Sequence, residues 1–250
     1  VRLRRNFTRL DPTMSAEDFD IDRLAEYLHL DPAQVARLVE RGKLPARRVS
    51  GSWRFSSAEI HHWLEEQMGL LSENELQHME GVLRGPRGAT AQESPSIAEL
   101  LPTEAIAIPL GARTRGSAIT SMAELAARTG WLWDPDKMAE AVRQREEMHP
   151  TALDSGVALL HPRRPLPGIL GQAFVALGVS QQGIPFGGAR SAMTDIYFLI
   201  LSTDDRGHLR TLARLSRLVA DLELVAELRA AEGPGAALAA MREAEDRLKH

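Results

Sequence analysis

Residues 195–201 have the sequence Asp-Ile-Tyr-Phe-Leu-Ile-Leu, which is apolar almost throughout. A short apolar run of this kind is typical of a β-strand that is covered on both faces. Residues 172–177 form a similar stretch, and shorter strands are expected at 105–110 and 156–160. The stretch 208–218 instead places leucines at helical spacing, which predicts a core-facing helix. Strands that alternate with helices predict an α/β sandwich for the larger part of the chain.

The composition excludes several classes of protein. Of the 250 residues, 44% are hydrophobic and 26% are charged, a balance typical of globular domains. No apolar run reaches the length of about 18 residues that a membrane helix needs, and no basic-then-apolar leader points to secretion. The absence of cysteine excludes disulfides, thiolate metal sites and cysteine nucleophiles. These features predict a cytoplasmic protein without membrane insertion.

The clearest domain boundary lies in residues 85–96, which contain two prolines, two glycines and small polar residues without apolar periodicity. Such a segment buries too little apolar surface to offset the entropy of ordering it. We therefore expect an N-terminal module at 1–68, a helix and linker at 69–95, and a C-terminal domain at 96–250. The linker helix begins with the capping box Ser72-Glu73-Asn74-Glu75. It is expected either to form a homodimer or to pack on the N-terminal module.

Two short helices are expected early in the N-terminal module. Apolar residues recur at helical spacing over 21–28. Asp31-Pro32 then starts a second helix, because aspartate accepts hydrogen bonds at a helix cap and proline has no N–H to lose. Gly42 stands where the left-handed residue after a helix belongs. The turn pair Ser50-Gly51, between apolar residues, predicts a hairpin.

Four pieces of this module point to a known family. They are Leu-Ala-Glu-Tyr-Leu at 24–28, Arg-Gly-Lys-Leu-Pro-Ala at 41–46, Gly-Ser-Trp-Arg-Phe at 51–55 and Trp-Leu-Glu-Glu at 63–66. On these pieces the module resembles the excisionase-type, MerR-like winged helix-turn-helix domain. The resemblance implies that the module binds duplex DNA.

Positive charge is concentrated in the same module, although the whole chain has a net charge of −4. Between Arg37 and Arg54 there are six basic residues and one acidic residue, which indicates one small basic surface. The second helix is expected to enter the major groove, and the wing to contact the phosphate backbone. The candidate DNA contacts are Gln34, Arg37 and Arg41 on the helix, and Arg47, Arg48 and Arg54 on the wing. Alternatively, these arginines form a solvated face on a module for protein–protein contacts.

Three pieces of the C-terminal domain point to a second family. They are Ala-Val-Arg-Gln-Arg-Glu-Glu at 141–147, Gly-Val-Ala-Leu-Leu-His-Pro at 156–162 and His-Leu-Arg-Thr-Leu-Ala-Arg-Leu at 208–215. With the order of strands and helices, they resemble the type-2 IIA domain of the bacterial phosphotransferase system. That group includes the mannitol/fructose IIA domains and the nitrogen-regulatory IIA protein. The resemblance implies an α/β sandwich with a mixed sheet.

The second resemblance also implies roles for three side chains. His161 would accept a phosphoryl group from an HPr-like phosphocarrier in a phosphoenolpyruvate-dependent relay, because neutral imidazole is nucleophilic near neutral pH. Arg145 would bind the phosphoryl oxygens, and His208 would lie against His161. Two departures from the family pattern flank the histidine: Leu160 replaces a common proline before it, and Pro162 follows it.

Together the two resemblances predict a regulatory protein that binds DNA and is phosphorylated on His161. It would be a phosphohistidine carrier rather than a metabolic enzyme, and its protein partners would be an HPr-like carrier and a IIB domain or regulatory target. One alternative is a plain IIA phosphocarrier in a sugar or nitrogen relay. Another is a IIA-like sensor that binds a ligand and is never phosphorylated. We expect no cofactor and no metal site, since the adjacent His61 and His62 diverge on a helix and no other metal-ligand spacing occurs.

Two smaller expectations concern the helices of the C-terminal domain. Ser117 is expected to cap the helix that ends near Gly130. The stripe formed by Arg210, Arg214 and Arg217 is expected to be a solvated helix face.

Overall fold

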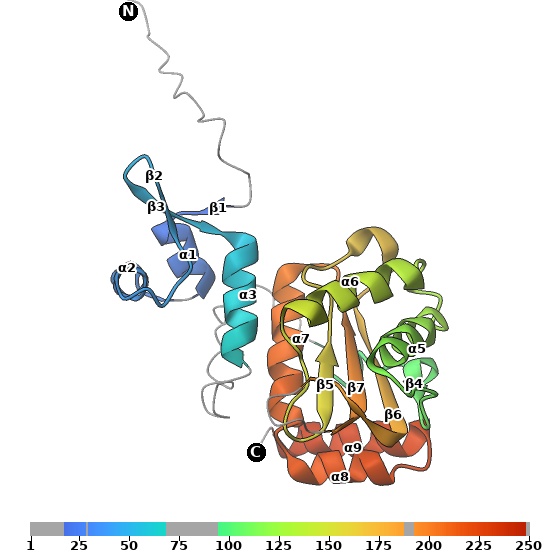
Figure 1. The fold of residues 1–250 in the computed structure, drawn as a ribbon. Coiled ribbons are helices and arrows are strands. Elements are labelled where there is room, and N and C mark those ends of the chain that lie inside the picture. Colours follow the sequence, from blue (N-terminus) through green and yellow to red (C-terminus); the bar gives the residue numbers. More distant parts are fainter. Residues whose placement is uncertain (1–17, 29, 69–94, 188–192, 249–250) are drawn as a thin grey trace, which may run out of the picture. The chain divides into compact units, whose positions relative to one another are not determined.

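The computed structural model in Figure 1 describes residues 18–28, 30–68, 95–187 and 193–248. The chain folds as two compact units, residues 1–63 and 64–250. Nearly all of the predicted helix and linker at 69–95 lies outside the described residues, so the predicted domain limits stay a prediction. Among the described residues, no helix is both long enough and apolar enough to cross a membrane.

The described part of the smaller unit is built on an antiparallel sheet with the strand order β1-β3-β2. The elements up to residue 68 are β1 (Asp18–Phe19), α1 (Ile21–Leu28), α2 (Pro32–Glu40), β2 (Arg47–Val49), β3 (Ser52–Ser56) and α3 (Ser57–Met68). Its core is formed by buried side chains of α1, α2 and β3: Leu24, Leu28, Val35, Val39 and Phe55. Two helices followed by a hairpin and a third helix match the predicted winged helix-turn-helix.

Local hydrogen bonds explain where α2 begins and ends. The Asp31 carboxylate accepts from the Ala33 N–H at 2.8 Å, and Gln34 Oε1 accepts from the Asp31 N–H at 3.1 Å, which completes a capping box. Gly42 has a φ of +65°, the left-handed conformation predicted for the residue that ends this helix. Ser50 and Gly51 also have positive φ, as a tight hairpin turn requires.

The larger unit alternates helices and strands. Its described elements are η1 (Thr103–Ala105), β4 (Ile106–Ala107), α5 (Arg115–Ala127), α6 (Pro135–Met148), β5 (Val157–Leu160), η2 (Pro167–Ile169), β6 (Phe174–Pro185), β7 (Met193–Leu201), α7 (Asp205–Leu218), α8 (Leu222–Ala230) and α9 (Pro234–Arg247). The strands form one sheet in the order β4-β6-β7-β5. β6 and β7 pair antiparallel, whereas β4 is parallel to β6 and β5 is parallel to β7. The predicted α/β fold with a mixed sheet is confirmed.

Both faces of the sheet are buried. Ala158 and Tyr197 belong to a core that also contains Met122 of α5 and Val142 of α6, the helices seen beside the sheet in Figure 1. Phe198, which points to the opposite face, is also fully buried, and α7 contacts both β5 and β7. Helices on both faces explain why residues 195–201 are apolar at nearly every position.

Two local expectations were wrong. The cap of α5 is Thr114 rather than Ser117: Thr114 Oγ1 accepts from the Ser117 N–H at 3.1 Å, and Ser117 Oγ accepts from the Thr114 N–H at 2.9 Å. Ser117 is therefore the inner member of a capping box. The strand expected at 105–110 is shorter than predicted, since β4 ends at Ala107, ahead of Pro109, which has no N–H to donate to a sheet.

The predicted solvated stripe on α7 is wrong for two of its three arginines. Arg217 is buried, and Arg214 Nε lies 2.9 Å from Oε1 of the buried Glu245 in α9. The same carboxylate accepts from the backbone N–H groups of Ile97 at 2.8 Å and Ala98 at 3.0 Å. α9 thus places a buried carboxylate beside Arg214 of α7. The arginine and the two N–H groups are the partners that a buried charge requires.

Candidate functional site

The two predicted site histidines lie close together in the larger unit. His161 follows β5 directly, and His208 lies in the first turn of α7. Their ring centroids are 5.1 Å apart, and the ring planes are inclined by 53°. β5 and β7 are parallel neighbours, and α7 follows β7 after a short turn. The sheet topology therefore brings both histidines to the carboxyl ends of adjacent strands.

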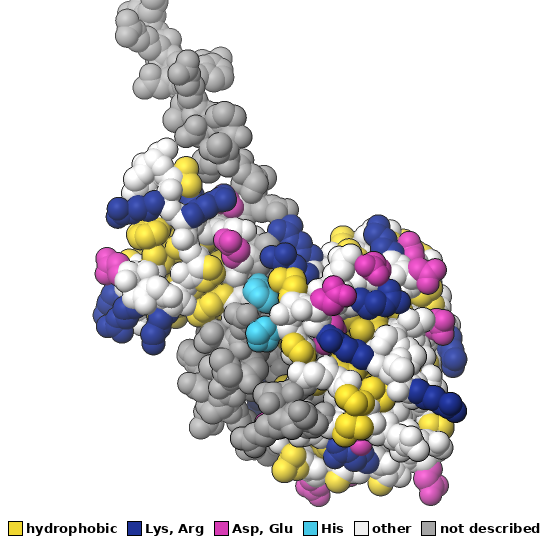
Figure 2. All heavy atoms as spheres, viewed as in Figure 1, with side chains coloured by type: hydrophobic (Ala, Val, Ile, Leu, Met, Phe, Trp, Pro, Cys, Tyr) yellow, Lys and Arg dark blue, Asp and Glu magenta, His cyan; other side chains and the backbone are white. Residues whose placement is uncertain are grey.

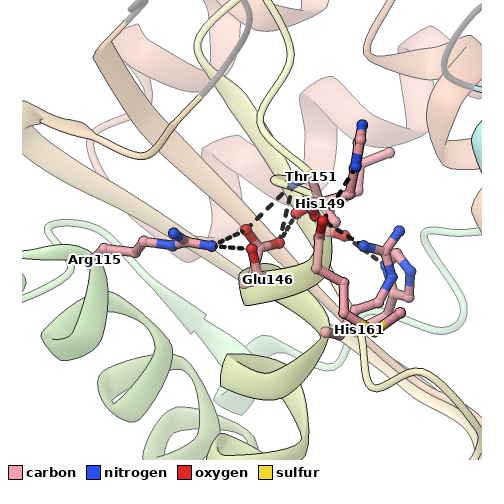
Figure 3. Close-up of polar contacts among 8 residues, drawn as sticks. Arg115, Glu146, His149, Thr151 and His161 are labelled. Atoms are coloured by element: carbon pink, nitrogen blue, oxygen red, sulfur yellow. Dashed lines mark hydrogen bonds and ion pairs between the residues drawn. The ribbon is translucent and has the colours of Figure 1, made fainter.

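Arg145, the third predicted site residue, lies in the last turn of α6. Its Nη1 donates to the carbonyl oxygen of His149 at 2.8 Å. His149 belongs to the segment before β5, and a bridge between Ala152 and Ala158 pairs this segment with that strand. Figure 3 shows His149 and His161 in the same part of the domain. The structure thus connects Arg145 to the edge of β5 through the His149 carbonyl.

The backbone determines the tautomer of His161. Nδ1 of the ring lies 2.7 Å from the carbonyl oxygen of Leu159. A carbonyl oxygen only accepts hydrogen bonds, so Nδ1 carries the ring proton in this contact. In the neutral ring the lone pair is then on Nε2. Nε2 is therefore the ring nitrogen of His161 whose lone pair is available.

The site is almost enclosed. The exposed fraction is 2% for His161, 3% for His208 and 5% for Arg145. Electrostatic interactions are stronger in such surroundings than in water. A partner protein can reach Nε2 of His161 only if the exposure of this ring increases. Arg163 and Arg164, which follow Pro162, are exposed.

The start of α7 holds His208 in place. Asp204 caps the helix, and its carboxylate accepts from the Gly207 N–H at 2.7 Å. Ser202 Oγ lies 3.5 Å from Nδ1 of His208. His208 is the fourth residue of α7 rather than its first. The Gly207 N–H is thus engaged by the cap, and the same turn places the imidazole of His208 next to His161.

In the smaller unit, the predicted contact residues Gln34 and Arg37 of α2, and Arg41 directly after it, are all exposed. Gln34, Arg37 and Arg41 are spaced by three and four residues, which places them on one face of the helix, opposite the buried Val35 and Val39. Gln34 also uses its amide oxygen in the capping box of α2. Its side chain is therefore already held at the start of the helix.

The wing arginines have different surroundings. Arg48 lies over the ring of Trp53, with its guanidinium carbon 5.0 Å from the ring centroid. Arg47 forms an ion pair with Asp18 of β1, and Arg54 Nη1 lies 4.0 Å from Asp20 Oδ2. Arg48 is thus the wing arginine supported by an aromatic ring, whereas the charge of Arg47 is balanced by a carboxylate.

The surface view shows how this charge is distributed. In Figure 2, Lys and Arg side chains gather over α2 and over the β2–β3 hairpin of the smaller unit. We define the α2–wing surface as Gln34, Arg37, Arg41, Arg47, Arg48 and Arg54. A helix and a hairpin that both carry positive charge are the two parts that a winged helix-turn-helix presents to DNA.

The family of the larger unit follows from comparison with known proteins. The family model described as "Phosphoenolpyruvate-dependent sugar phosphotransferase system, EIIA 2" matches residues 99–244, more than half of the chain. The chain belongs to the EIIA 2 family. Its EIIA domain is preceded by a helix-turn-helix domain, for which the family model matches residues 19–68. A helix-turn-helix domain suggests DNA binding, and an EIIA domain suggests a role as a phosphocarrier or in nitrogen regulation.

Two relatives cover the EIIA domain. The nitrogen regulatory protein of Bradyrhizobium diazoefficiens is 32% identical over 138 residues, which are 54% of this chain and 86% of that protein. The fructose-specific EIIABC component of Bacillus subtilis is 27% identical over 142 residues, which are 56% of this chain and 22% of that protein. The chain therefore spans most of the first relative and about a fifth of the second.

A solved structure agrees with the observed fold. The nitrogen regulatory protein IIA-Ntr of Neisseria meningitidis superposes with a TM-score of 0.52 at 22% sequence identity. The match covers 58% of this chain and 98% of that one. At this identity the likeness shows that the EIIA domain shares the IIA fold.

Sequence reasoning gave no role to Glu146, which the EIIA domain buries beside Arg145. The Glu146 side chain is 1% exposed and accepts hydrogen bonds from Arg115 and Thr151. One signal was available: Glu146 is four residues after Val142 and therefore shares a helix face with this apolar residue. A carboxylate at such a position needs buried partners.

Among the described residues, no group of three or more His, Cys, Asp or Glu side chains is arranged to hold a metal ion. The described part of the helix-turn-helix domain and the EIIA domain therefore presents two candidate sites. They are the α2–wing surface and the pair formed by His161 and His208.

Proposed function

We propose that the EIIA domain accepts a phosphoryl group on Nε2 of His161 from an HPr-like phosphocarrier. We further propose that phosphorylation changes the affinity of the helix-turn-helix domain for duplex DNA. The chain would then be a cytoplasmic regulator whose state follows a phosphoenolpyruvate-dependent relay. The observation that supports this most strongly is the 2.7 Å contact between His161 Nδ1 and the Leu159 carbonyl.

That contact prepares the ring for transfer. The lone pair of Nε2 attacks the phosphorus of the donor, and a nitrogen–phosphorus bond forms. The bond between phosphorus and the donor atom breaks, and its electron pair stays on the donor. Nothing is oxidised or reduced, so no further reactant is needed. Phosphoryl transfer of this kind depends mainly on positioning and on nearby positive charge.

Arg145 and His208 are suited to supplying positioning and charge. An arginine remains charged in proteins and offers several donors in a fixed plane. The His208 ring, 5.1 Å from the His161 ring between centroids, can donate a hydrogen bond to a phosphoryl oxygen. Docking of the donor must expose the His161 ring, because 2% of its surface is accessible before docking.

The proposed switch is electrostatic. A phosphoryl group adds about two negative charges near neutral pH. The α2–wing surface is positively charged, and binding to DNA depends on neutralising phosphates. A new negative charge on the same chain changes this balance, either directly or through a partner such as a IIB domain, a regulatory target or a second copy of the chain. Comparison of the phosphorylated with the unphosphorylated chain shows whether the affinity for DNA rises or falls.

Phosphoryl acceptance is tested on the full chain. The protein is incubated with phosphoenolpyruvate, the first enzyme of the relay and an HPr-type carrier, and it is analysed by intact-mass and peptide mass spectrometry. One phosphoryl group on His161 is expected. The group should be absent in His161→Ala and present in His149→Ala, a matched control that removes an exposed imidazole and keeps the carbonyl bound by Arg145.

An unmodified chain beside a fully phosphorylated carrier would overturn the proposal in favour of a ligand sensor. A phosphorylated chain whose DNA affinity equals that of the unphosphorylated chain would overturn the switch. That result would leave a plain phosphocarrier in a sugar or nitrogen relay.

A further inference from the structure

We propose that Glu146 is a positioning residue for phosphoryl transfer. Through Thr151 and Leu159 it fixes the tautomer of His161, and through the same segment it places Arg145. This inference rests on the proposed function, because the reaction it serves is phosphorylation of His161. Glu146 does not touch the phosphoryl group, and it acts through the backbone between α6 and β5.

Glu146 is the centre of a buried hydrogen-bond network (Figure 3). Its carboxylate accepts from Arg115 Nη2 at 3.0 Å. The Thr151 N–H donates to both carboxylate oxygens, at 3.2 Å and 3.3 Å, and the Thr151 hydroxyl donates to Oε1. The side chain is 1% exposed, so these contacts replace the water that the charge has lost.

Arg115 of α5 also stabilises the position of Glu146. It lies at the start of α5 and also donates to the backbone carbonyl of Glu146. That carbonyl is in the last turn of α6, where carbonyl groups have no partner within the helix. Arg115 therefore fixes the end of α6 and neutralises the buried carboxylate. Glu146 in turn fixes Thr151.

Thr151 holds the outer edge of β5. β5 is an edge strand of the sheet, with β7 on its inner side. On its outer side the Leu159 N–H donates to the Thr151 carbonyl at 3.4 Å, and the Leu153 N–H donates to the Val157 carbonyl at 2.8 Å. The segment held by Glu146 thus pairs with β5 as a short additional strand.

This pairing bears directly on the acceptor ring. In a β-strand the N–H and C=O of one residue project to the same side. The Leu159 carbonyl therefore projects to the edge where its N–H meets Thr151, and this carbonyl holds Nδ1 of His161 at 2.7 Å. If the segment were released, the outer edge of β5 would lose this pairing, the Leu159 carbonyl could turn away, and the ring would lose the partner that keeps the proton on Nδ1.

The segment held by Glu146 also positions Arg145. Its Nη1 donates to the carbonyl of His149, two residues before Thr151. One carboxylate thus controls the geometry of both the nucleophile and the cation. Misplacing reacting groups by about 1 Å can cost about a hundredfold in rate.

The test uses the full chain with the substitutions Glu146→Ala and Glu146→Gln. Thr151→Val is a third variant, which removes the hydrogen bond from the Thr151 hydroxyl to Glu146. Glu140→Ala is the matched control, because Glu140 lies on the same helix and pairs with Arg143 at the surface. The first readout is the ring ¹⁵N spectrum of unphosphorylated His161. We expect Nδ1–H in the wild type and in Glu140→Ala, and a mixture of tautomers in Glu146→Ala and Thr151→Val. Glu146→Gln keeps an acceptor for Thr151 and should restore part of the Nδ1–H population.

The second readout is phosphoryl acceptance. We expect kcat to fall about tenfold to a hundredfold in Glu146→Ala, with the KM for the phosphorylated carrier unchanged. A wild-type tautomer and wild-type kcat in folded Glu146→Ala or Thr151→Val would overturn the inference. If Glu146→Ala does not fold, Thr151→Val and Glu146→Gln decide between these results. If the wild type accepts no phosphoryl group, the proposed function fails, and the tautomer readout still decides whether Glu146 positions the ring.

Discussion

Arg48 lies across Trp53 on the wing, with its guanidinium carbon 5.0 Å from the centroid of the ring. The preceding residue, Arg47, is ion-paired with Asp18, whose side chain is 4% exposed. Neighbouring arginines of one strand thus have different roles. Arg47 compensates a buried negative charge, whereas Arg48 stands on an aromatic support with its charge available to an external anion.

Arg48→Ala is therefore expected to weaken DNA binding. Each lost phosphate contact reduces the slope of log K against log salt by about 0.9. Fluorescence anisotropy with a DNA duplex, repeated over a series of salt concentrations, measures this slope. Arg128→Ala serves as the control, because it removes an exposed arginine of the EIIA domain, outside the α2–wing surface. An identical slope for Arg48→Ala and the wild type would show that Arg48 does not contact phosphates.

Much of the fold could be predicted from local patterns. The apolar run at 195–201 predicted β7, Asp31-Pro32 predicted the start of α2, and Gly42 predicted its end. β6 could not be predicted in full, because its second half is mostly polar and contains Gly183. That half is a strand because it pairs with β7, a long-range contact with no local signature.

The residue types of the candidate site could be predicted, but the groups that hold these residues in place could not. The resemblance indicated His161, Arg145 and His208, and the structure brings the two histidines together. The Leu159 carbonyl that selects the tautomer is a backbone group, so no residue type could reveal it. Glu245 appears in the sequence as an ordinary acidic residue of a helix, and only the packing of distant segments shows that it is buried.

Glu245→Ala is expected to destabilise the EIIA domain. The substitution leaves Arg214 and the N–H groups of Ile97 and Ala98 without their shared acceptor in a largely buried region. Loss of one partner of a buried charge pair costs about 3–5 kcal/mol. Urea titration followed by circular dichroism gives the free energy of unfolding. Glu243→Ala, which removes an exposed carboxylate of the same helix, should change this free energy little. Equal midpoints for both variants would refute the stabilising role of Glu245.

The EIIA domain should lose stability at alkaline pH through Tyr197. Burial raises the pKa of Tyr197 from 10.0 to about 12, and its hydroxyl donates to the Thr194 carbonyl at 2.6 Å. A raised pKa means that the unfolded chain releases this proton first. Stability attributable to the buried phenol is therefore present below pH 10 and declines as pH rises toward about 12.

Tyr197→Phe should flatten this part of the pH dependence. Denaturant titrations at a series of pH values between 9 and 12 measure the effect, since these values bracket the two pKa values of the phenol. Tyr27→Phe, in the helix-turn-helix domain, is the control with the other tyrosine of the chain. An alkaline decline of the same steepness in Tyr197→Phe would contradict the assignment.

The coupling between the two domains predicts a difference between two substitutions at one position. His161→Asp places a negative charge where the phosphoryl group would be, and His161→Ala removes the acceptor without adding charge. Their affinities for the same DNA duplex should differ, because phosphorylation is proposed to act through its charge. Binding curves that coincide at low and at physiological salt would contradict the electrostatic switch.

We expect Nε2 of His161 to receive the phosphoryl group, because the Leu159 carbonyl holds the proton on Nδ1. The most direct measurement is a long-range ¹H–¹⁵N spectrum of the chain after phosphorylation by the HPr-type carrier. The expected product is phosphohistidine at position 161, with phosphorus bonded to Nε2 and the proton retained on Nδ1. A phosphoryl group on Nδ1, or a His161 spectrum unchanged while the carrier is phosphorylated, would contradict it.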